Sequence, residues 1–239
     1  MKNSFKINGG KQLKGELVPQ GAKNEALQVI SAVLLTEEEV VIHNVPNIED
    51  VNKLIDLLAF IGVEISQIAE NSWKFRASNI QLKKLYEPEF RKIASTLRGS
   101  ILTVGPLLSR FKQSVAAQPG GDKIGRRRLD THFIGFQNIG AKVEFDSATN
   151  FYHITADKLQ GTQMLLDEAS VTGTGNVIMA ATMAEGTTTV FNAACEPYIQ
   201  QLCKMLKSMG ADISGIGSNL VTINGVEKLK GCEHTILPD

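Results

Sequence analysis

The sequence predicts an α/β fold in which one module occurs three times, in pseudo-symmetric copies with helices inside and sheets outside. Two observations carry this prediction. A segment that begins at Val40 returns 148 residues later, at Thr188, and helical and strand patterns alternate along the chain. Because spacing alone does not fix how repeated units pack, an unrelated two-layer α/β sandwich stays open as the alternative.

The repeat is clearest around a helix that ends at a glycine. Val40 to Ser66 match Thr188 to Ser214 without a gap. In both copies apolar residues recur with the i, i+3, i+4, i+7 spacing of a helix that buries one face. These residues are Val51, Leu54, Ile55, Leu58 and Ile61 in one copy, and Ile199, Leu202, Cys203, Leu206 and Met209 in the other. Gly62 and Gly210 end the two helices, and a short strand-like run follows each.

A weaker middle copy completes the set of three. It leads into Gly140, which is equivalent to Gly62 and Gly210. Earlier helices, expected at about 24–35, 95–108 and 176–184, open the copies, so the module reads helix, strand, helix, strand, strand. The copies occupy about 21–88, 89–160 and 161–232 of a domain that spans 21–232.

The two ends of the chain fall outside the copies. Residues 1–20 contain two strand-like runs, Phe5 to Ile7 and Gly15 to Val18. Thr235 to Asp239 stops after a strand-like run with no closing element, so we expect a truncated chain.

Composition limits the possible partners and location. Lys plus Arg and Asp plus Glu each number 25, whereas nucleic-acid-binding proteins usually carry a basic excess. Met1 to Leu13 lack the apolar core of a signal peptide, and no run of about 20 apolar residues is present. We therefore expect a cytoplasmic protein that binds neither nucleic acid nor membrane. Its three cysteines, Cys195, Cys203 and Cys232, are expected to be reduced and to hold no metal.

Each copy carries cationic or polar groups near the start of its first helix, where an anion is favoured. In the first copy these groups are Lys23 and Asn24. We expect Asn24 to cap the helix. Arg98 lies near the second helix start, and Gly173 to Asn176 take the corresponding place in the third. Ser170, Val171 and Thr172 just before it add hydroxyls and backbone donors. The alternative in the first copy is a plain cap beside a solvated lysine.

The longest loop signal runs from Gln118 to Arg128. Its paired glycines allow close approach to a ligand, and the guanidinium groups of Arg126 to Arg128 suit phosphate or carboxylate. Asp122 becomes a candidate general acid if a closed site raises its pKa. The alternatives are a solvated or nucleic-acid-binding basic loop and a plain turn aspartate. The residues alone therefore indicate a site for a ligand with several negative charges.

Five motifs occur in register from about Phe5 to Asp239. They are Gly21 to Leu27, Leu97 to Ser100 with Gly105 to Leu107, Pro119 to Gly121, Ile124 to His132, and Ala184 to Thr188 with Asn192 to Ala194. Together they closely resemble the UDP-N-acetylglucosamine 1-carboxyvinyltransferases, of the EPSP synthase-like superfamily. The resemblance implies transfer of the enolpyruvyl group of phosphoenolpyruvate to the 3-hydroxyl of UDP-N-acetylglucosamine. Phosphate leaves, no metal or cofactor takes part, and the product enters peptidoglycan synthesis.

The resemblance also implies two domains of three copies each, with the active site between them. Residues 1–20 would belong to the second domain, which is mostly absent here, and 233–239 would begin the crossover to it. That domain would supply the general base and further arginines. We therefore expect the chain to fold but to turn over little or no substrate.

The resemblance further implies a role for each candidate residue. Lys23 and Arg127 would contact the phosphate of phosphoenolpyruvate, and Asp122 would be the general acid of a closing lid. Asn24 would contact the sugar nucleotide, and Arg98 would hold the anionic part of the site. Arg128, Leu129 and Asp130 would hold the uracil end, and Ser170, Val171 and Thr172 would lie at the diphosphate.

Two positions depart from the family pattern. Most members have cysteine where this chain has Asp122, and a carboxylic acid is far less prone than a thiolate to attack an epoxide. The resemblance therefore predicts fosfomycin resistance in the full-length enzyme. Glu168 stands where a lysine near the diphosphate is common, so that lysine's contact is not expected here.

Two other functions stay open from the sequence. One is a non-catalytic domain that binds a sugar nucleotide or another anion. The other is an RNA-processing enzyme built on similar repeats, with Arg126 to Arg128 facing phosphates.

Overall fold

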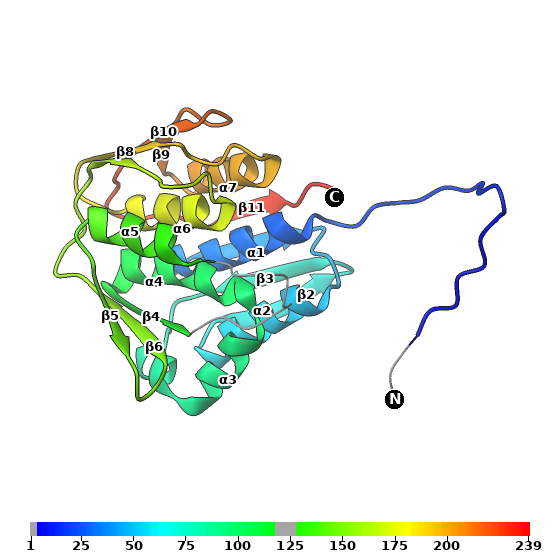
Figure 1. The fold of residues 1–239 in the computed structure, drawn as a ribbon, viewed down its shortest axis with the longest axis horizontal. Helices are drawn as coiled ribbons and strands as arrows, with labels where there is room; N and C mark the ends of the chain where they lie inside the picture. The colour runs from blue at the N-terminus through cyan, green and yellow to red at the C-terminus, as the bar shows by residue number, and fades with distance from the viewer. Residues whose placement is uncertain (1–3, 118–127) are drawn as a thin grey trace.

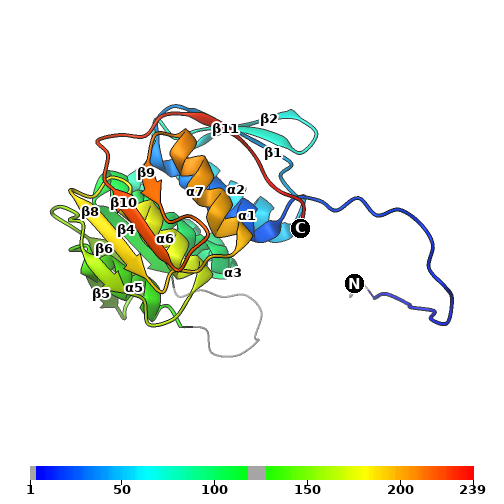
Figure 2. The ribbon, with the colours of Figure 1, turned by 90° about the horizontal axis from the view of Figure 1, so that it is seen from above.

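The computed structural model describes residues 4–117 and 128–239, which form three sheets around a helical centre. Figure 1 shows the sheets toward the outside of the body, and Figure 2 shows the same body from above, with most helices between the sheets. The predicted α/β arrangement, with helices inside and sheets outside, is confirmed.

The first and last copies of the module agree element by element. The first contains α1 (Lys23–Ala32), β1 (Glu39–His43), α2 (Glu49–Phe60), β2 (Glu64–Ala69) and β3 (Ser72–Arg76). The last contains α6 (Val171–Ala181), β8 (Thr187–Phe191), α7 (Pro197–Ser208), β9 (Asp212–Ser214) and β10 (Leu220–Asn224). Every element of the last copy begins 148 residues after its counterpart, as Val171 does after Lys23. The opening helix of the last copy therefore begins at Val171, and the predicted start at residue 176 is wrong.

The middle copy opens with a broken helix. In place of the continuous helix predicted at 95–108, the chain forms α3 (Pro88–Thr96), the 3-10 helix η3 (Arg98–Thr103) and α4 (Val104–Phe111). The copy continues with β4 (Gln113–Ala117), α5 (Asp130–Asn138), β5 (Lys142–Asp146) and β6 (Phe151–Thr155). Two further 3-10 helices are η1 (Val33–Leu35) and η2 (Leu82–Tyr86). The break places Arg98 at the first residue of η3.

Two of the three sheets contain a fourth strand that the module pattern did not predict. The strand orders are β11-β1-β3-β2, β7-β8-β10-β9 and β4-β6-β5, where β7 spans Gln163–Leu165 and β11 spans Cys232–Thr235. Within each copy the strands pair antiparallel, whereas β7 and β11 pair parallel with β8 and β1. The domain boundary predicted at residue 232 thus falls at the first residue of β11.

The glycines that end the second helices keep the three copies in register. Gly62, Gly140 and Gly210 have φ of +103°, +97° and +102°, which is a conformation that glycine adopts without strain. The residue before each glycine accepts the same backbone hydrogen bond. The pairs are Gln81 to Ile61, Gln160 to Ile139 and Lys230 to Met209, at 2.8, 2.9 and 2.8 Å.

Close packing around α6 depends on two glycines that face it. A Cβ on Gly105 of α4 would lie 2.4 Å from the backbone oxygen of Asn176, and one on Gly135 of α5 would lie 2.2 Å from Cγ2 of Val177. A larger residue at either place would push the helices apart. Because α6 is buried from Gly173 onward, its first residues are held firmly at the surface of the core.

Residues 4–20 leave the body as an extended segment (Figure 1). They contain no strand, so the strands predicted at residues 5–7 and 15–18 are wrong for this structure. A strand needs a neighbour to pair with, and none lies beside this segment. Its large apolar side chains are 89% to 95% exposed: Phe5, Ile7, Leu13, Leu17 and Val18. The assignment of residues 1–20 to a second domain stays a prediction.

Candidate functional site

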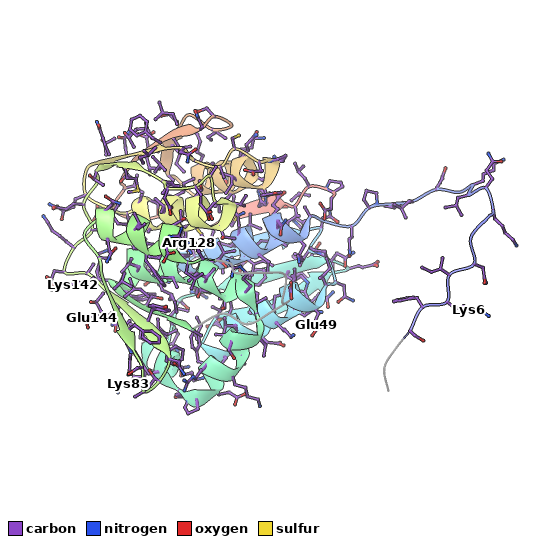
Figure 3. The ribbon with its side chains drawn as sticks, in the orientation of Figure 1. Lys6, Glu49, Lys83, Arg128, Lys142 and Glu144 are labelled. Carbon is purple, nitrogen blue, oxygen red and sulfur yellow. The ribbon has the colours of Figure 1, made fainter. Side chains whose placement is uncertain are left out.

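A cavity of about 800 Å³ lies where α1, η3 and α6 begin, so that all three copies contribute to its wall. Seven of the candidate residues line it: Lys23, Asn24, Arg98, Arg128, Ser170, Val171 and Thr172. Arg128 enters from the segment before α5 and Glu49 from the first residue of α2; both are labelled in Figure 3. The predicted convergence of groups from successive copies is therefore present for these seven residues.

The start of α1 presents a charged group to the cavity. The helix begins at Lys23, and Ala22 is its N-cap, without a side-chain hydrogen bond. The prediction that Asn24 caps the helix is wrong, because Asn24 is its second residue, and its side chain is exposed on the cavity wall. The ammonium of Lys23 lies 3.2 Å from Oδ2 of Asp50 on α2, with both side chains about two-fifths exposed.

The start of α6 presents hydroxyl and backbone groups instead. Ser170 is the N-cap, and its Oγ accepts a hydrogen bond from the amide of Gly173 at 3.2 Å. Val171 and Thr172 are the first two helical residues, so they correspond to Lys23 and Asn24, and Gly173 to Asn176 do not. The free N–H groups at such a start favour an anion.

Two arginines lie between these helix starts. Nη2 of Arg98 donates a hydrogen bond to the backbone oxygen of Arg128 at 3.4 Å. Nε of Arg128 donates to the carboxylate of Asp130, and this hydrogen bond is the main reason that the pKa of the Arg128 guanidinium is raised. Asp130 therefore orients Arg128 without lining the cavity itself.

The cavity wall also carries carboxylates, and two of them, Glu49 and Asp50, were not placed there by sequence reasoning. Glu49, Asp50 and Glu168 line it together with four cations: Lys23, Lys53, Arg98 and Arg128. Glu49 pairs with Lys53 across one turn of α2, at 2.7 Å. The i,i+4 spacing of that pair was a usable signal, whereas the presence of Gln28 and Tyr198 in the wall depends on tertiary packing. The excess of positive charge among these side chains is small, so the features of the wall that favour an anion are the helix starts and the arginine geometry.

The remaining candidates divide into two groups. Leu129 and Asp130 do not line the cavity; Leu129 is the N-cap of α5 and packs partly buried against the core. Asp122 and Arg127 lie outside the described residues. The roles given to all of these residues stay predictions.

Two features are absent from the described residues, 4–117 and 128–239. No helix there is long and apolar enough to cross a bilayer. No three His, Cys, Asp or Glu side chains there gather closely enough to hold a metal ion.

Comparison with known proteins agrees with the motifs. The family model of EPSP synthase (3-phosphoshikimate 1-carboxyvinyltransferase) matches residues 7–239. The UDP-N-acetylglucosamine 1-carboxyvinyltransferases of Bacteroides thetaiotaomicron and Treponema denticola are 58% and 48% identical to this chain over 99% of its length. The match covers 54% of each of these two proteins, so the chain spans about half the length of the curated relatives it matches.

Solved structures show the same fold at low sequence identity. The enolpyruvyl transferase NikO from Streptomyces tendae superposes with a TM-score of 0.81 at 18% identity, over 98% of this chain and 54% of that one. An EPSP synthase from Acinetobacter baumannii gives a TM-score of 0.72 at 21% identity, over 97% and 51%. The resemblance inferred from the motifs is confirmed, and the chain belongs to the EPSP synthase family of enzymes.

Proposed function

We propose that this chain is part of an enzyme that transfers the enolpyruvyl group of phosphoenolpyruvate to the 3-hydroxyl of UDP-N-acetylglucosamine. Phosphate is released, and the reaction is the first committed step of peptidoglycan synthesis. The observation that carries the proposal is the cavity where Lys23, Arg98 and Arg128 meet the starts of α1 and α6. The names of relatives with 57% to 58% identity support this choice of substrates.

Both substrates are anionic, and the cavity offers two kinds of positive group to them. The starts of α1 and α6 provide free backbone N–H groups and the positive ends of helix dipoles. Arg98 and Arg128 provide guanidinium groups, which bind phosphate oxygens in pairs. Asp50 holds Lys23 at the wall until a phosphate competes for the ammonium.

The proposed chemistry is an addition followed by an elimination. The oxygen of the 3-hydroxyl bonds to the enol carbon, the methylene carbon takes up a proton, and a base removes the hydroxyl proton. The bond between the former enol carbon and the phosphate oxygen then breaks. A proton leaves the new methyl group, and the double bond is restored. We assign protonation of the methylene to Asp122, and the phosphate contacts to Lys23 and Arg127. These steps require no metal or cofactor.

The sugar nucleotide takes the other side of the same cavity. We assign the sugar to Asn24, the diphosphate to Ser170, Val171 and Thr172, and the uracil end to Arg128 with Leu129 and Asp130. Arg98 holds the anionic part of the site between the two substrates. The hydrogen bond from Arg128 to Asp130 supports their assignment to one subsite.

A carboxylic acid at Asp122 makes the enzyme resistant to fosfomycin. The drug acts as an epoxide electrophile, and a carboxyl group attacks an epoxide far less readily than a thiolate does. Mass spectrometry of the full-length protein after exposure to fosfomycin checks this proposal. A covalent adduct on Asp122 contradicts it.

Catalysis needs a second domain of the same protein, and the enzyme works in the cytoplasm. The chain spans about half the length of its relatives, which supports a partner domain that supplies the general base. The exposed apolar side chains of residues 4–20 support a docking partner for that segment. By itself, this chain acts as a domain that binds the sugar nucleotide without turnover.

Calorimetry on this chain separates the proposed function from RNA binding. UDP-N-acetylglucosamine should bind and single-stranded RNA should not. Arg128→Ala should weaken sugar-nucleotide binding, whereas Arg76→Ala, an exposed arginine of β3 outside the cavity wall, should not. Binding of RNA alone would favour the RNA-processing alternative. A phosphate-release assay on the full-length protein then tests turnover, and its absence with both substrates present rejects the transferase.

A further inference from the structure

His132 is an enclosed imidazole that reaches the cavity wall through another side chain. It is the third residue of α5 and is 1% exposed. Its Nε2 lies 3.2 Å from Oγ1 of Thr172, which lines the cavity, and its Nδ1 lies 2.9 Å from Nδ2 of Asn176, one turn further along α6. Buried polar groups are satisfied in folded proteins, so these two contacts determine where the ring carries its proton.

Two backbone groups fix the orientation of the Asn176 amide. The N–H of Gly105 can only donate, and it donates to Oδ1 of Asn176 at 2.9 Å. The carbonyl oxygen of Ile101 can only accept, and it accepts from Nδ2 at 2.8 Å. The second hydrogen on Nδ2 therefore goes to Nδ1 of His132, which must accept it.

This arrangement places the ring proton on Nε2. The Nε2–H group then donates to Oγ1 of Thr172, which leaves the hydroxyl hydrogen of Thr172 available for another acceptor. Thr172 is partly exposed, and its side chain has no other hydrogen-bond partner within residues 4–117 and 128–239. Because Thr172 lines the cavity, an acceptor for its hydroxyl hydrogen can be supplied by a ligand bound there.

We propose that His132 is a positioning residue that fixes the Thr172 hydroxyl as a hydrogen-bond donor to an anionic oxygen of the bound ligand. Each group donates in one direction, from Asn176 to His132, from His132 to Thr172, and from Thr172 to the ligand. The inference rests on the proposed function only for the identity of that oxygen, which belongs to a diphosphate. His132 transfers no proton and does not touch the ligand.

Burial keeps His132 in the neutral form that this chain of donors requires. Desolvation, helped by the nearby charge of Arg98, lowers the pKa of His132 from 6.5 to about 3. A protonated ring would carry N–H groups on both nitrogens, and its Nδ1–H would then face the N–H of Asn176. The donor arrangement therefore persists well below neutral pH.

Nitrogen-15 NMR of the parent chain, labelled at its histidines, tests the proton position. We expect the His132 signals of an Nε2–H ring, unchanged on acidification to about pH 5. The chain has four histidines, and the signal that disappears in His132→Gln identifies His132 among them. A proton on Nδ1, or titration of His132 near its ordinary pKa, overturns the proposal.

Calorimetry with inorganic pyrophosphate tests the link to the ligand. Thr172→Val should weaken pyrophosphate binding by about tenfold, which is the effect of one hydrogen bond to a charged group, and Thr172→Ser should restore most of it. His132→Gln should weaken binding in the parent chain and have no further effect in the Thr172→Val background.

Two results would overturn the inference: unchanged pyrophosphate affinity in Thr172→Val, or equal weakening by His132→Gln in both backgrounds, which indicates a structural role alone. UDP-N-acetylglucosamine, titrated in parallel, separates this inference from the proposed function. Thr172-dependent binding of pyrophosphate without any binding of the sugar nucleotide would reject the proposed substrate and leave the role of His132 standing.

Discussion

The starts of α1 and α6 occupy equivalent positions in two copies of one module, but their chemistry differs. Lys23 and Asn24 correspond to Val171 and Thr172 at the offset of 148 residues. At α1 the helix has no side-chain cap, and the cavity receives a lysine that is paired with Asp50. The first start therefore contributes a charged group, for which a bound anion would compete with Asp50.

At α6 the cavity receives a neutral donor that is held in place. Ser170 caps the helix, and Thr172 is held by His132, which Asn176 holds in turn. The residue of α1 that corresponds to Asn176 is Gln28, whose Oε1 is buried without a hydrogen-bond partner among the described residues. The two copies thus place two helix starts on one cavity, one with a charged side chain and the other with a neutral hydroxyl held by hydrogen bonds.

The largest effect is expected at the charged start. In the full-length protein, Lys23→Ala should lower kcat/KM by about a hundredfold or more, because it removes the cation that we assign to the leaving phosphate. Steady-state phosphate release measures this change. Lys158→Ala is the matched control, since its 2.9 Å ion pair with Glu185 lies outside the cavity wall. An effect below about threefold would mean that the α6 start carries the anion by itself.

The next largest effect is expected from the packing of α4 against α6, next to the start of α6. Gly105→Ala should lower the free energy of unfolding by about 2 kcal/mol, because its Cβ would meet both the backbone oxygen and Oδ1 of Asn176. Urea denaturation measures the change. Gly15→Ala, which meets nothing within 4 Å, is the control and should leave the midpoint in place. Equal midpoints for both variants would show that α4 and α6 can separate without cost.

The dependence of the free energy of unfolding on pH tests whether His132 is held in its neutral form behind the start of α6. The pKa of His132 is about 3 in the folded chain and 6.5 when exposed, so the unfolded chain takes up the proton first. The contribution of neutral His132 to the free energy of unfolding is therefore present above pH 6.5 and is lost as the pH falls toward 3. Between about pH 7 and pH 5.5 the free energy of unfolding should fall by about 1 kcal/mol.

Two histidine variants check that this loss belongs to His132. In urea denaturation at both pH values, His132→Gln should remove the loss, and His153→Gln, on the partly exposed face of β6, should retain it. A loss that survives His132→Gln contradicts the assignment.

Features set by local sequence were predicted well. The register of the copies depends on glycines 62, 140 and 210, and on apolar spacing within single helices, which nearby residues determine. The start of α6 was misplaced because Gly173 and Gly175 are poor helix formers, whereas close packing of Gly173 against Thr131 of α5, and of Gly175 against Gln28 of α1, requires small residues there. The strand β7 was missed, and the pairing of β11 was not predicted from the strand-like run near residue 235, because parallel pairing joins segments far apart in the chain.

The candidate site was predicted in part for the same reason. Lys23, Arg98 and Thr172 lie at helix starts, and the repeat brings helix starts together. His132 could not be assigned a role from its position in the chain, because its partners lie 40 and 44 residues away on another helix. The neighbouring Asp130 does not line the cavity and contacts it through its hydrogen bond with Arg128, and its role at the uracil end stays a prediction.

The smallest effect is expected from Glu168, the carboxylate beside the proposed diphosphate subsite. Glu168 lines the cavity, and its charge acts on Arg128. Glu168→Lys should therefore tighten pyrophosphate binding to this chain, by about three- to tenfold at low ionic strength. The gain should shrink at about 0.5 M salt, because such charges are partly exposed and screened. Calorimetry at two salt concentrations measures both.

Glu144→Lys separates this local effect from a change in net charge. Glu144 is an exposed residue of β5, and Figure 3 labels it on the strand side of the body, away from Arg128. Both variants change the net charge equally, so only a local effect makes Glu168→Lys the tighter binder. If the two variants bind pyrophosphate alike, Glu168 does not act at the α6 start. The difference between the two helix starts would then depend on Thr172 and Lys23 alone.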